Sequence, residues 1–353
     1  MHQLNEILEN KVINNLISGF ERSPDQLNKP HESDAEIIRI GSLKLAVTTD
    51  SISEEITAGL YDDPYLIGWM IVTVNISDLS AVGATPIGIL ISEIIPETFS
   101  EEKIKELQRG ISDACKAYGT FVLGGDTNEG KNLVLTGTAV GIINSEKSIS
   151  RVGCKPGDIV YSSGKLGLGN AYAISKLLIT TSSSPDYKPI ARIKECELIS
   201  KYASCCMDTS DGLISTLDQL MRLNDSGFAI STDLEKMIDD DALNYSKKLN
   251  IPPWLLLAGQ HGEFELIFTI PQKLNEAFLS EASKIGFKPI ELGKVIPDKK
   301  VKIPLYDKMI PIDSAFIRNL PTETKGDINH YLKLLLEYDS QLNNDACLNF
   351  TTI

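Results

Sequence analysis

Hydrophobic positions in the first half of the chain alternate between the two-residue period of strands and the spacing of helices. Residues 43–49 form a short β-rich run, and residues 66–82 have helical spacing that stops at Gly83. Residues 87–95 predict a buried strand, and residues 133–143 predict a longer strand after a polar turn. Helices and strands that alternate in this way predict an α/β domain.

A capping pattern marks the helix that follows the second of these strands. Thr98 and Glu101 precede a helical run that ends near Tyr118, and Gly119 supplies its stop. Residues 121–123 then predict a strand that runs into the sequence Gly124-Gly125-Asp126-Thr127.

The apolar periodicity breaks at residues 144–158, where Ser, Lys, Arg, Gly and Pro prevail. Beyond the break, strands are predicted at residues 159–162, 265–270 and 290–295, and helices at residues 170–179 and 213–223. We therefore expect an N-terminal domain, a C-terminal domain and a helical tail, at residues 1–148, 149–320 and 321–353.

Composition narrows the possible partners. The chain has 353 residues and a net charge of −14, which argues against nucleic acid because that partner requires a basic surface. An acidic protein binds phosphates when divalent cations bridge the two sets of negative charge. No run of about 18 apolar residues is present, and residues 1–20 resemble an amphipathic helix rather than a signal peptide. The six cysteines form no paired framework, so we expect a cytoplasmic protein without a membrane partner.

Several aspartates stand at predicted strand ends or beside glycines. Asp50 ends the first strand, Asp126 follows two glycines, and Asp208 and Asp211 bracket a turn before Gly212. Glycine lets a phosphate approach the backbone closely, and carboxylate oxygens suit Mg²⁺ that carries nucleotide phosphates. Taken singly, each aspartate also fits a helix-capping or turn-forming role. Because no P-loop motif is present, we expect ATP chemistry that depends on these spaced aspartates.

Other polar positions are weaker site candidates. Asn75 and Asp78 lie three residues apart in an apolar helical pattern, so they share a helix face, and a buried charge there requires a partner such as a metal. His261 lies in an acidic turn before a strand and marks a possible site edge, although no second histidine has zinc-ligand spacing. The glycines of residues 164–169 predict a tight turn.

Taken in chain order, these motifs resemble a known superfamily. The first half carries Val47-Thr48-Thr49-Asp50, Asn75-Ile76-Ser77-Asp78-Leu79 and Gly124-Gly125-Asp126-Thr127. The second half carries Lys155-Pro156-Gly157-Asp158, Met207-Asp208-Thr209-Ser210-Asp211-Gly212 and Glu265-Leu266-Ile267-Phe268-Thr269. From Asp34 to about Val295 the chain is similar to aminoimidazole ribonucleotide synthetase and selenophosphate synthetase, and within that superfamily it most resembles the thiamine monophosphate kinases.

The resemblance implies a two-domain α/β (α+β) fold like that of aminoimidazole ribonucleotide synthetase. In that fold the N-domain sheets of a homodimer form a shared β-barrel, the C-domain is an α/β sandwich, and ATP lies near the dimer interface. The metal ligands implied are Asp34, Asp50, Asp78, Asp126 and Asp208. The nucleotide contacts implied are Thr49, Asn75, Gly124, Gly125 and Asp126, and the catalytic residues implied are Asp208 and Asp211.

The departures from the kinase pattern fall mainly on the acceptor side. Ser33 precedes Asp34 where the kinases have two adjacent aspartates, and residues 53–58 keep Glu54 but lack a histidine and an aromatic residue. His261 and Glu263 lie in the other altered segment. We predict ATP and Mg²⁺ as cofactors, and a small-molecule acceptor contacted by Glu54, His261 and Glu263.

The motifs leave three functions open. The first is an ATP-dependent phosphotransferase whose acceptor site differs from that of the kinases. The second is an ATP-dependent synthetase or dehydratase that activates an amide or thioamide oxygen. The third is a nucleotide-binding protein without turnover.

Overall fold

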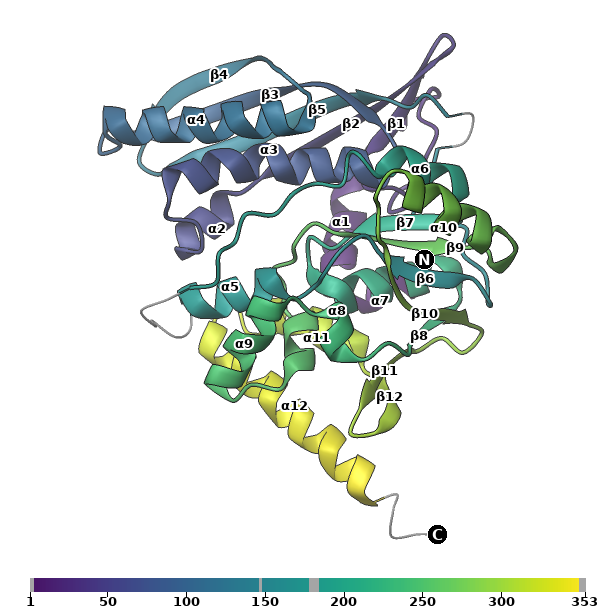
Figure 1. Cartoon of the computed structure of the whole chain (residues 1–353). Coiled ribbons are helices and arrows are strands. Elements are labelled where there is room, and N and C mark those ends of the chain that lie inside the picture. The colour runs from purple at the N-terminus through teal and green to yellow at the C-terminus, as the bar shows by residue number, and fades with distance from the viewer. Residues whose placement is uncertain (1–2, 146–147, 178–183, 349–353) are drawn as a thin grey trace.

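The computed structural model describes residues 3–145, 148–177 and 184–348 of the chain. Two open sheets, each with its own helices, form an upper and a lower layer in Figure 1. The mixed α/β class predicted from the hydrophobic pattern is therefore confirmed. Every helix in the described ranges is too short or too polar to span a bilayer.

The upper layer contains a five-stranded sheet with the order β1-β2-β5-β3-β4. Its strands are β1 (Glu36–Ile40), β2 (Leu43–Ser51), β3 (Thr85–Pro96), β4 (Val122–Gly130) and β5 (Val134–Ile142). β3 and β4 are parallel because helix α4 (Glu101–Tyr118) connects them, and the other neighbours are antiparallel. β4 is the last strand in this order, so it forms one edge of the sheet.

Helix α3 (Pro64–Ala81) lies between the two layers (Figure 1). Fifteen of its residues are buried, because the sheet, α4 and the second layer surround it. Gly68 and Gly110 let α3 and α4 pack closely, since a Cβ atom at Gly68 would lie 2.0 Å from the Leu107 carbonyl oxygen. The short helix α2 (Ser53–Ala58) follows β2.

The lower layer contains a seven-stranded sheet with the order β12-β11-β8-β10-β6-β9-β7. Its strands are β6 (Ile159–Ser162), β7 (Cys205–Asp208), β8 (Gly227–Ile230), β9 (Leu266–Ile270), β10 (Ile290–Ile296), β11 (Val301–Leu305) and β12 (Lys308–Ile312). Alternate residues of β9 face opposite sides, so Phe268 and Ile267 enter different clusters of buried side chains.

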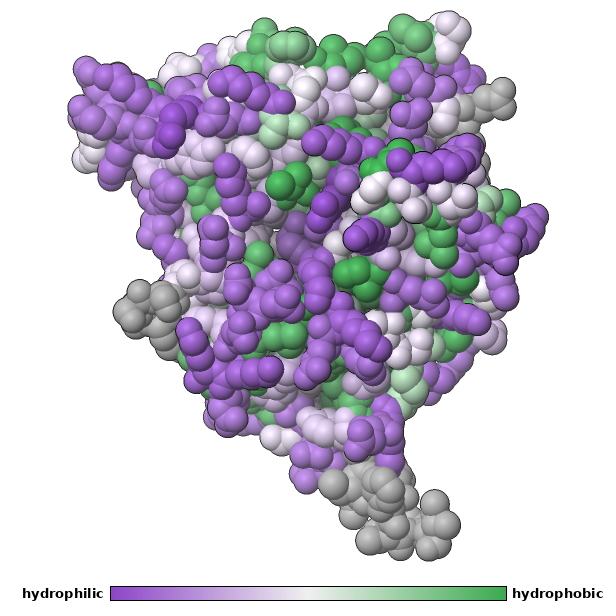
Figure 2. All heavy atoms as spheres, in the orientation of Figure 1, coloured by the Kyte–Doolittle hydropathy of each residue, from purple (hydrophilic) through white to green (hydrophobic). Residues whose placement is uncertain are grey.

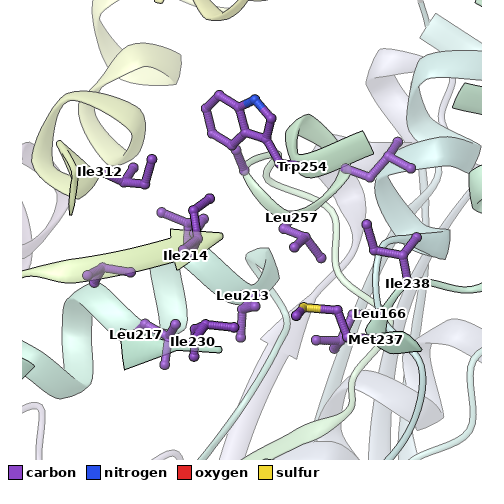
Figure 3. Packing of buried hydrophobic residues seen from close by; sticks show 14 of the residues in the cluster. Leu166, Leu213, Ile214, Leu217, Ile230, Met237, Ile238, Trp254, Leu257 and Ile312 are labelled. Carbon is purple, nitrogen blue, oxygen red and sulfur yellow. The ribbon is translucent and has the colours of Figure 1, made fainter. Parts of the chain in front are cut away.

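Helices cover both faces of this lower sheet. They are α5 (Leu168–Leu177), α6 (Cys196–Tyr202), α7 (Gly212–Asn224), α8 (Leu234–Met237), α9 (Asp240–Leu249), α10 (Asn275–Lys284), α11 (Ser314–Glu323) and α12 (Ile328–Leu348). Phe278 of α10 packs on one face, while Leu213 of α7 and Trp254 belong to the larger core on the other (Figure 3). Single-turn helices lie at η1 (Leu4–Glu6), η2 (Pro253–Leu257) and η3 (Gln272–Leu274). Helix α1 (Leu8–Ile17) contacts α11.

Two local predictions require correction. Helix α4 is capped by Ser100 rather than by Thr98, and the Ser100 hydroxyl accepts the Lys103 N–H at 3.4 Å. The strand predicted at residues 121–123 continues through Gly124 and Gly125 as β4, so these glycines do not form the glycine-containing turn that their sequence also suggested before Asp126. A Cβ atom at Gly125 would lie 1.8 Å from the Ile91 carbonyl oxygen, so packing against β3 explains this glycine.

The other predicted elements are present with small changes of boundary. The helix predicted at residues 170–179 corresponds to α5, and its last two predicted positions lie outside the described residues. Both sheets are open within one chain, so the dimeric barrel stays a prediction.

Candidate functional site

Three aspartates from distant parts of the chain meet between the two layers. Asp34 precedes β1, Asp78 lies on α3, and Asp208 ends β7. One carboxylate oxygen from each lies within 4.8 Å of the other two. The structure therefore brings together predicted ligands that are separated by 44 and 130 residues in the sequence.

Neighbouring side chains hold each carboxylate in place. The Ser77 hydroxyl donates to Asp208 Oδ2 at 2.6 Å, and Arg151 Nη2 donates to Asp34 Oδ1 at 2.9 Å. Thr48 donates a hydrogen bond to Asp78. The second oxygen of Asp34 is buried and has no hydrogen-bond partner among the described residues. An unpaired carboxylate oxygen beside two other carboxylates is the arrangement that a hard cation satisfies.

Burial and the charges of neighbouring carboxylates raise the pKa values of Asp78 and Asp208. Burial, followed by the charge of Asp34, raises the pKa of Asp208 to about 7. Burial, followed by the charges of Asp50 and Asp208, raises the pKa of Asp78 well above its usual value. Without a bound metal ion, Asp78 and Asp208 therefore keep their protons to a higher pH than ordinary aspartates do, and a bound cation would favour the ionised carboxylates.

The cluster opens into a cleft of about 430 Å³ between the layers. Strand β2 contributes Thr49 and Asp50, and the lower layer contributes Asp211 and His261. Polar residues dominate this lining, which suits a phosphorylated and hydrated ligand better than an apolar one.

Asp50 and Asp211 both reach the cleft. The Asp50 carboxyl shares a hydrogen bond with Asp78, and burial raises the pKa of Asp50. Asp211 stands at the N-cap of α7, but its side chain caps no backbone N–H of that helix. Burial, followed by the charge of Glu9, raises the pKa of Asp211 to about 6. Its carboxyl is thus available to the cleft rather than committed to helix capping.

Asn75 does not line the cleft, but it contacts the backbone of Asp50, which does. Its Oδ1 accepts the Asp50 N–H at 3.2 Å, and its Nδ2 donates to the Ile71 carbonyl oxygen at 2.9 Å. Both ends of the buried amide are therefore occupied. Its geometry fits a residue that positions Asp50 better than one that contacts nucleotide.

Gly124, Gly125 and Asp126 are likewise absent from the cleft lining. All three are exposed on β4, and two strands separate β4 from the strand that carries Asp50. Since neighbouring strands lie about 4.8 Å apart, Asp126 stands roughly 14 Å from Asp50 across the sheet. Within one chain, Asp126 therefore does not share an ion with the cluster of Asp34, Asp78 and Asp208.

The three residues predicted to contact the acceptor have different environments. His261 lines the cleft, and burial lowers the pKa of its imidazole to about 4, so the ring is neutral at pH 7. Glu54 lies at a neighbouring cavity instead. Glu263 is buried, and its Oε2 accepts the N–H groups of Gly167 and Gly169 at 2.7 and 3.4 Å. Its carboxyl thus orders the glycine turn of residues 164–169.

Arg151, whose guanidinium pairs with Asp34 of the cluster, was not predicted from the sequence. It lies in the polar break between the two halves, and its Nε is buried without a partner among the described residues. Its position just before the Lys155-Pro156-Gly157-Asp158 motif was an available signal. Glu9, Asn10 and Ile13 of α1 also line the cleft, although the sequence indicated only an amphipathic helix there.

Comparisons with known proteins point to one family. A family model for AIR synthase related protein, N-terminal domain, matches residues 32–143. Over 312 residues the chain is 32% identical to the thiamine-monophosphate kinase of Methanocaldococcus jannaschii, covering 82% of this chain and 94% of that relative. Over 252 residues it is 31% identical to the thiamine-monophosphate kinase of Escherichia coli, covering 67% and 74% respectively.

Solved structures share the architecture. AaThiL complexed with AMPPCP and TMP superposes with a TM-score of 0.69 at 25% identity, covering 85% of this chain and 94% of that one. The hydrogenase maturation protein HypE of Escherichia coli superposes with a TM-score of 0.65 at 17% identity, covering 86% and 96%, and shows the fold alone.

Proposed function

This chain belongs to the thiamine-monophosphate kinase family, and on that basis we propose that its cleft transfers the γ-phosphoryl group of ATP to thiamine monophosphate. The new bond joins a phosphate oxygen of the acceptor to the γ-phosphorus, and the bond to the β,γ-bridging oxygen breaks. The products are thiamine diphosphate and ADP. The resemblance read from the motifs is confirmed at the level of the family, and the cluster of Asp34, Asp78 and Asp208 is the observation that carries the proposal.

The residues present fit Mg²⁺. Oxygens on opposite sides of an octahedral Mg²⁺ lie about 4.2 Å apart, so carboxylate oxygens within 4.8 Å of one another need only a small contraction. Asp34, Asp78 and Asp208 would hold the ion, and Asp50 lies beside them. When bound, Mg²⁺ would neutralise charge on the phosphates and align them.

The side chains of the cleft act mainly by positioning. The acceptor phosphate carries about −1.5 to −2 charges at pH 7, so its attacking oxygen needs no general base. Asp211 is therefore proposed to orient the acceptor or a second ion rather than to remove a proton. Ser77 and Arg151 fix the carboxylates of Asp208 and Asp34, which lowers the cost of ordering the site during the reaction.

We further propose that the chain is a homodimer joined through β3 and β4. Hydrophobic side chains gather along the upper margin of the molecule in Figure 2, above the first sheet. In β3, in β4 and just before β4, the exposed hydrophobic side chains include Ile87, Leu90, Phe121 and Leu123, and Phe121 is 70% exposed. β4 also presents an unpaired edge. A partner's β4 would supply Asp126 and its glycines to a site that they do not reach within their own chain.

The proposal is tested by incubating the chain with ATP, Mg²⁺ and thiamine monophosphate and measuring thiamine diphosphate and ADP. Asp78→Asn should lower kcat by at least about 100-fold, the scale of losing one preorganised electrostatic group. Asp186→Asn, an exposed position, is the matched control and should retain activity. Tight nucleotide binding without turnover would support the non-catalytic alternative, and ATP use only with amide substrates would support the synthetase alternative.

A further inference from the structure

Residues 184–192 form an extended segment, which we call the strap, that precedes α6 and runs along α3 (Figure 1). Trp69 Nε1 of α3 donates to the Pro189 carbonyl oxygen at 2.7 Å. The Tyr118 hydroxyl of α4 accepts the Ala191 N–H at 3.2 Å, and both hydrogen bonds are buried. The strap is therefore fastened to the upper layer, although the helices on either side of it in the chain, α5 and α6, belong to the lower one.

Tyr187 attaches the strap to the lower layer. Its hydroxyl donates to the Gly262 carbonyl oxygen at 2.7 Å, and its ring stacks on that of Tyr172 of α5, with the ring centroids 4.8 Å apart. Tyr187 is 5% exposed, and it lines neither the carboxylate cleft nor the neighbouring cavity. It therefore does not reach a ligand in the cleft, and its effect on the site passes through the residues that it holds.

Gly262 lies against the turn that carries Asp211. The Gly262 N–H donates to the Ser210 carbonyl oxygen at 2.8 Å, and a Cβ atom at Gly262 would lie 1.3 Å from the Thr209 carbonyl oxygen. That Thr209 oxygen also accepts the Gly212 N–H at 3.2 Å. Only a residue without a side chain allows two backbones to approach so closely. A displacement of Gly262 would therefore displace this turn.

The position of Asp211 depends on its backbone more than that of Asp208 does. The Asp208 carboxylate accepts the Ser77 hydroxyl at 2.6 Å, whereas the Asp211 side chain makes no capping hydrogen bond to α7. The turn therefore determines where the Asp211 carboxyl stands in the cleft. Asp50, which also lines the cleft, belongs to the upper layer. The strap thus connects the layer that carries Asp50 with the backbone that places Asp211.

We propose that Tyr187 is a positioning residue, which holds Asp211 in place across the cleft from Asp50. Its hydroxyl acts through Gly262, and the strap ties this contact to α3, so the site resists a movement of one layer against the other. The inference rests on the proposed function, because it concerns how the geometry for phosphoryl transfer is maintained. Small misplacements of groups that align the reactants lower the rate strongly, so loss of the hydroxyl should appear in kcat.

The test compares variants of two stacked tyrosines in the full chain. Tyr187→Phe removes the hydroxyl that binds Gly262 and keeps the ring, whereas Tyr172→Phe is the matched control from the same stack. With ATP, Mg²⁺ and thiamine monophosphate, Tyr187→Phe should lower kcat roughly tenfold and leave the Kd for AMPPCP within about twofold of the parent. Tyr172→Phe should keep the kcat of the parent. Trp69→Phe, which releases the strap from α3, should also lower kcat and is the second variant if Tyr187→Phe does not fold.

A double-mutant cycle with Asp211→Asn separates positioning from a general loss of stability. If Tyr187 acts through Asp211, adding Tyr187→Phe to the Asp211→Asn variant should lower kcat by less than about twofold. Losses that multiply independently would overturn the inference. A parent-like kcat in Tyr187→Phe, or an equal loss in Tyr172→Phe, would overturn it as well.

Hydrogen exchange tests the positioning without any turnover. The Gly262 and Gly212 amides donate the hydrogen bonds that join and close the turn. They should exchange with deuterium roughly tenfold faster in Tyr187→Phe than in Tyr172→Phe. If this acceleration occurs but the chain makes no thiamine diphosphate, the function is wrong and the positioning stands. If the chain makes thiamine diphosphate and the two variants exchange alike, the positioning is wrong and the function stands.

Discussion

The carboxylate cluster should make the metal-free protein less stable at alkaline pH. Burial and the neighbouring charge of Asp34 raise the pKa of Asp208 from 3.8 to about 7, so the folded state binds this proton more tightly than the unfolded chain does. A raised acid pKa gives stability that is present at low pH and is lost as pH rises from about 4 through about 7. This pKa difference corresponds to a loss of unfolding free energy on the order of 4 kcal/mol above pH 7. The figure is an upper bound, because structural relaxation around the ionised carboxylate reduces the loss.

Urea unfolding in the presence of EDTA between pH 5 and pH 8 measures this cost. The free energy of unfolding should fall by a few kcal/mol across that interval, and Mg²⁺ should restore it at pH 8 by binding only the folded state. Asparagine at position 208 cannot ionise, so Asp208→Asn should reduce the slope of the profile, leaving the part due to Asp78 and Asp211, and should exceed the parent in stability at pH 8 without metal. The control variant Asp186→Asn, at an exposed position, should show the same dependence of unfolding free energy on pH as the parent. A parent profile that is flat or rises from pH 5 to pH 8, or an unchanged slope in Asp208→Asn, would refute the electrostatic reasoning.

Three further predictions concern groups around the cluster and the proposed interface. Arg151→Met leaves the buried carboxylate of Asp34 without its ion-pair partner. In urea unfolding at pH 8 without metal, this variant should lose about 3–5 kcal/mol of unfolding free energy. A loss below about 1 kcal/mol would contradict the pairing. Leu123→Arg places a charge on the exposed face of β4 and should yield monomers in sedimentation, whereas a parent that is itself monomeric would remove the dimer proposal. Asp126→Asn should abolish Mg²⁺-dependent ATP binding, and unchanged affinity in calorimetry would show that β4 plays no part in the site.

The sequence predicted best where local chemistry decides the structure. Gly119 ends α4 in the left-handed conformation, as its place after the apolar run indicated. The buried run of α3 and the strand β3 were also predicted with errors of only a few residues. Strands β11 and β12 were missed because each is short and carries a proline, Pro304 and Pro311, which local reasoning takes as evidence against a strand.

The site residues likewise divide into those with a local signal in the sequence and those without one. Asp78 was recognisable because a charge inside an apolar helix needs a partner. The structure places Asp34 and Asp208 beside it, an arrangement that suits a shared metal ion. Arg151 was missed because it lies in a segment whose composition resembles a linker. Glu263 was assigned to the acceptor because its segment departs from the kinase pattern, but only the tertiary structure reveals that its carboxylate accepts the N–H groups of Gly167 and Gly169. Partners that come from distant segments leave no periodic signal in a single sequence.

The burial of α3 between the layers has a consequence for folding. Its apolar surface faces the first sheet and α4 on one side, while Ala81 and Ser77 contact the lower layer on the other. Neither layer alone covers this helix, so separating them would expose a long hydrophobic surface to water. We therefore expect the two layers to unfold in one cooperative transition. The backbone amides of α3 should exchange with deuterium only through that global event, and should be among the slowest in the molecule.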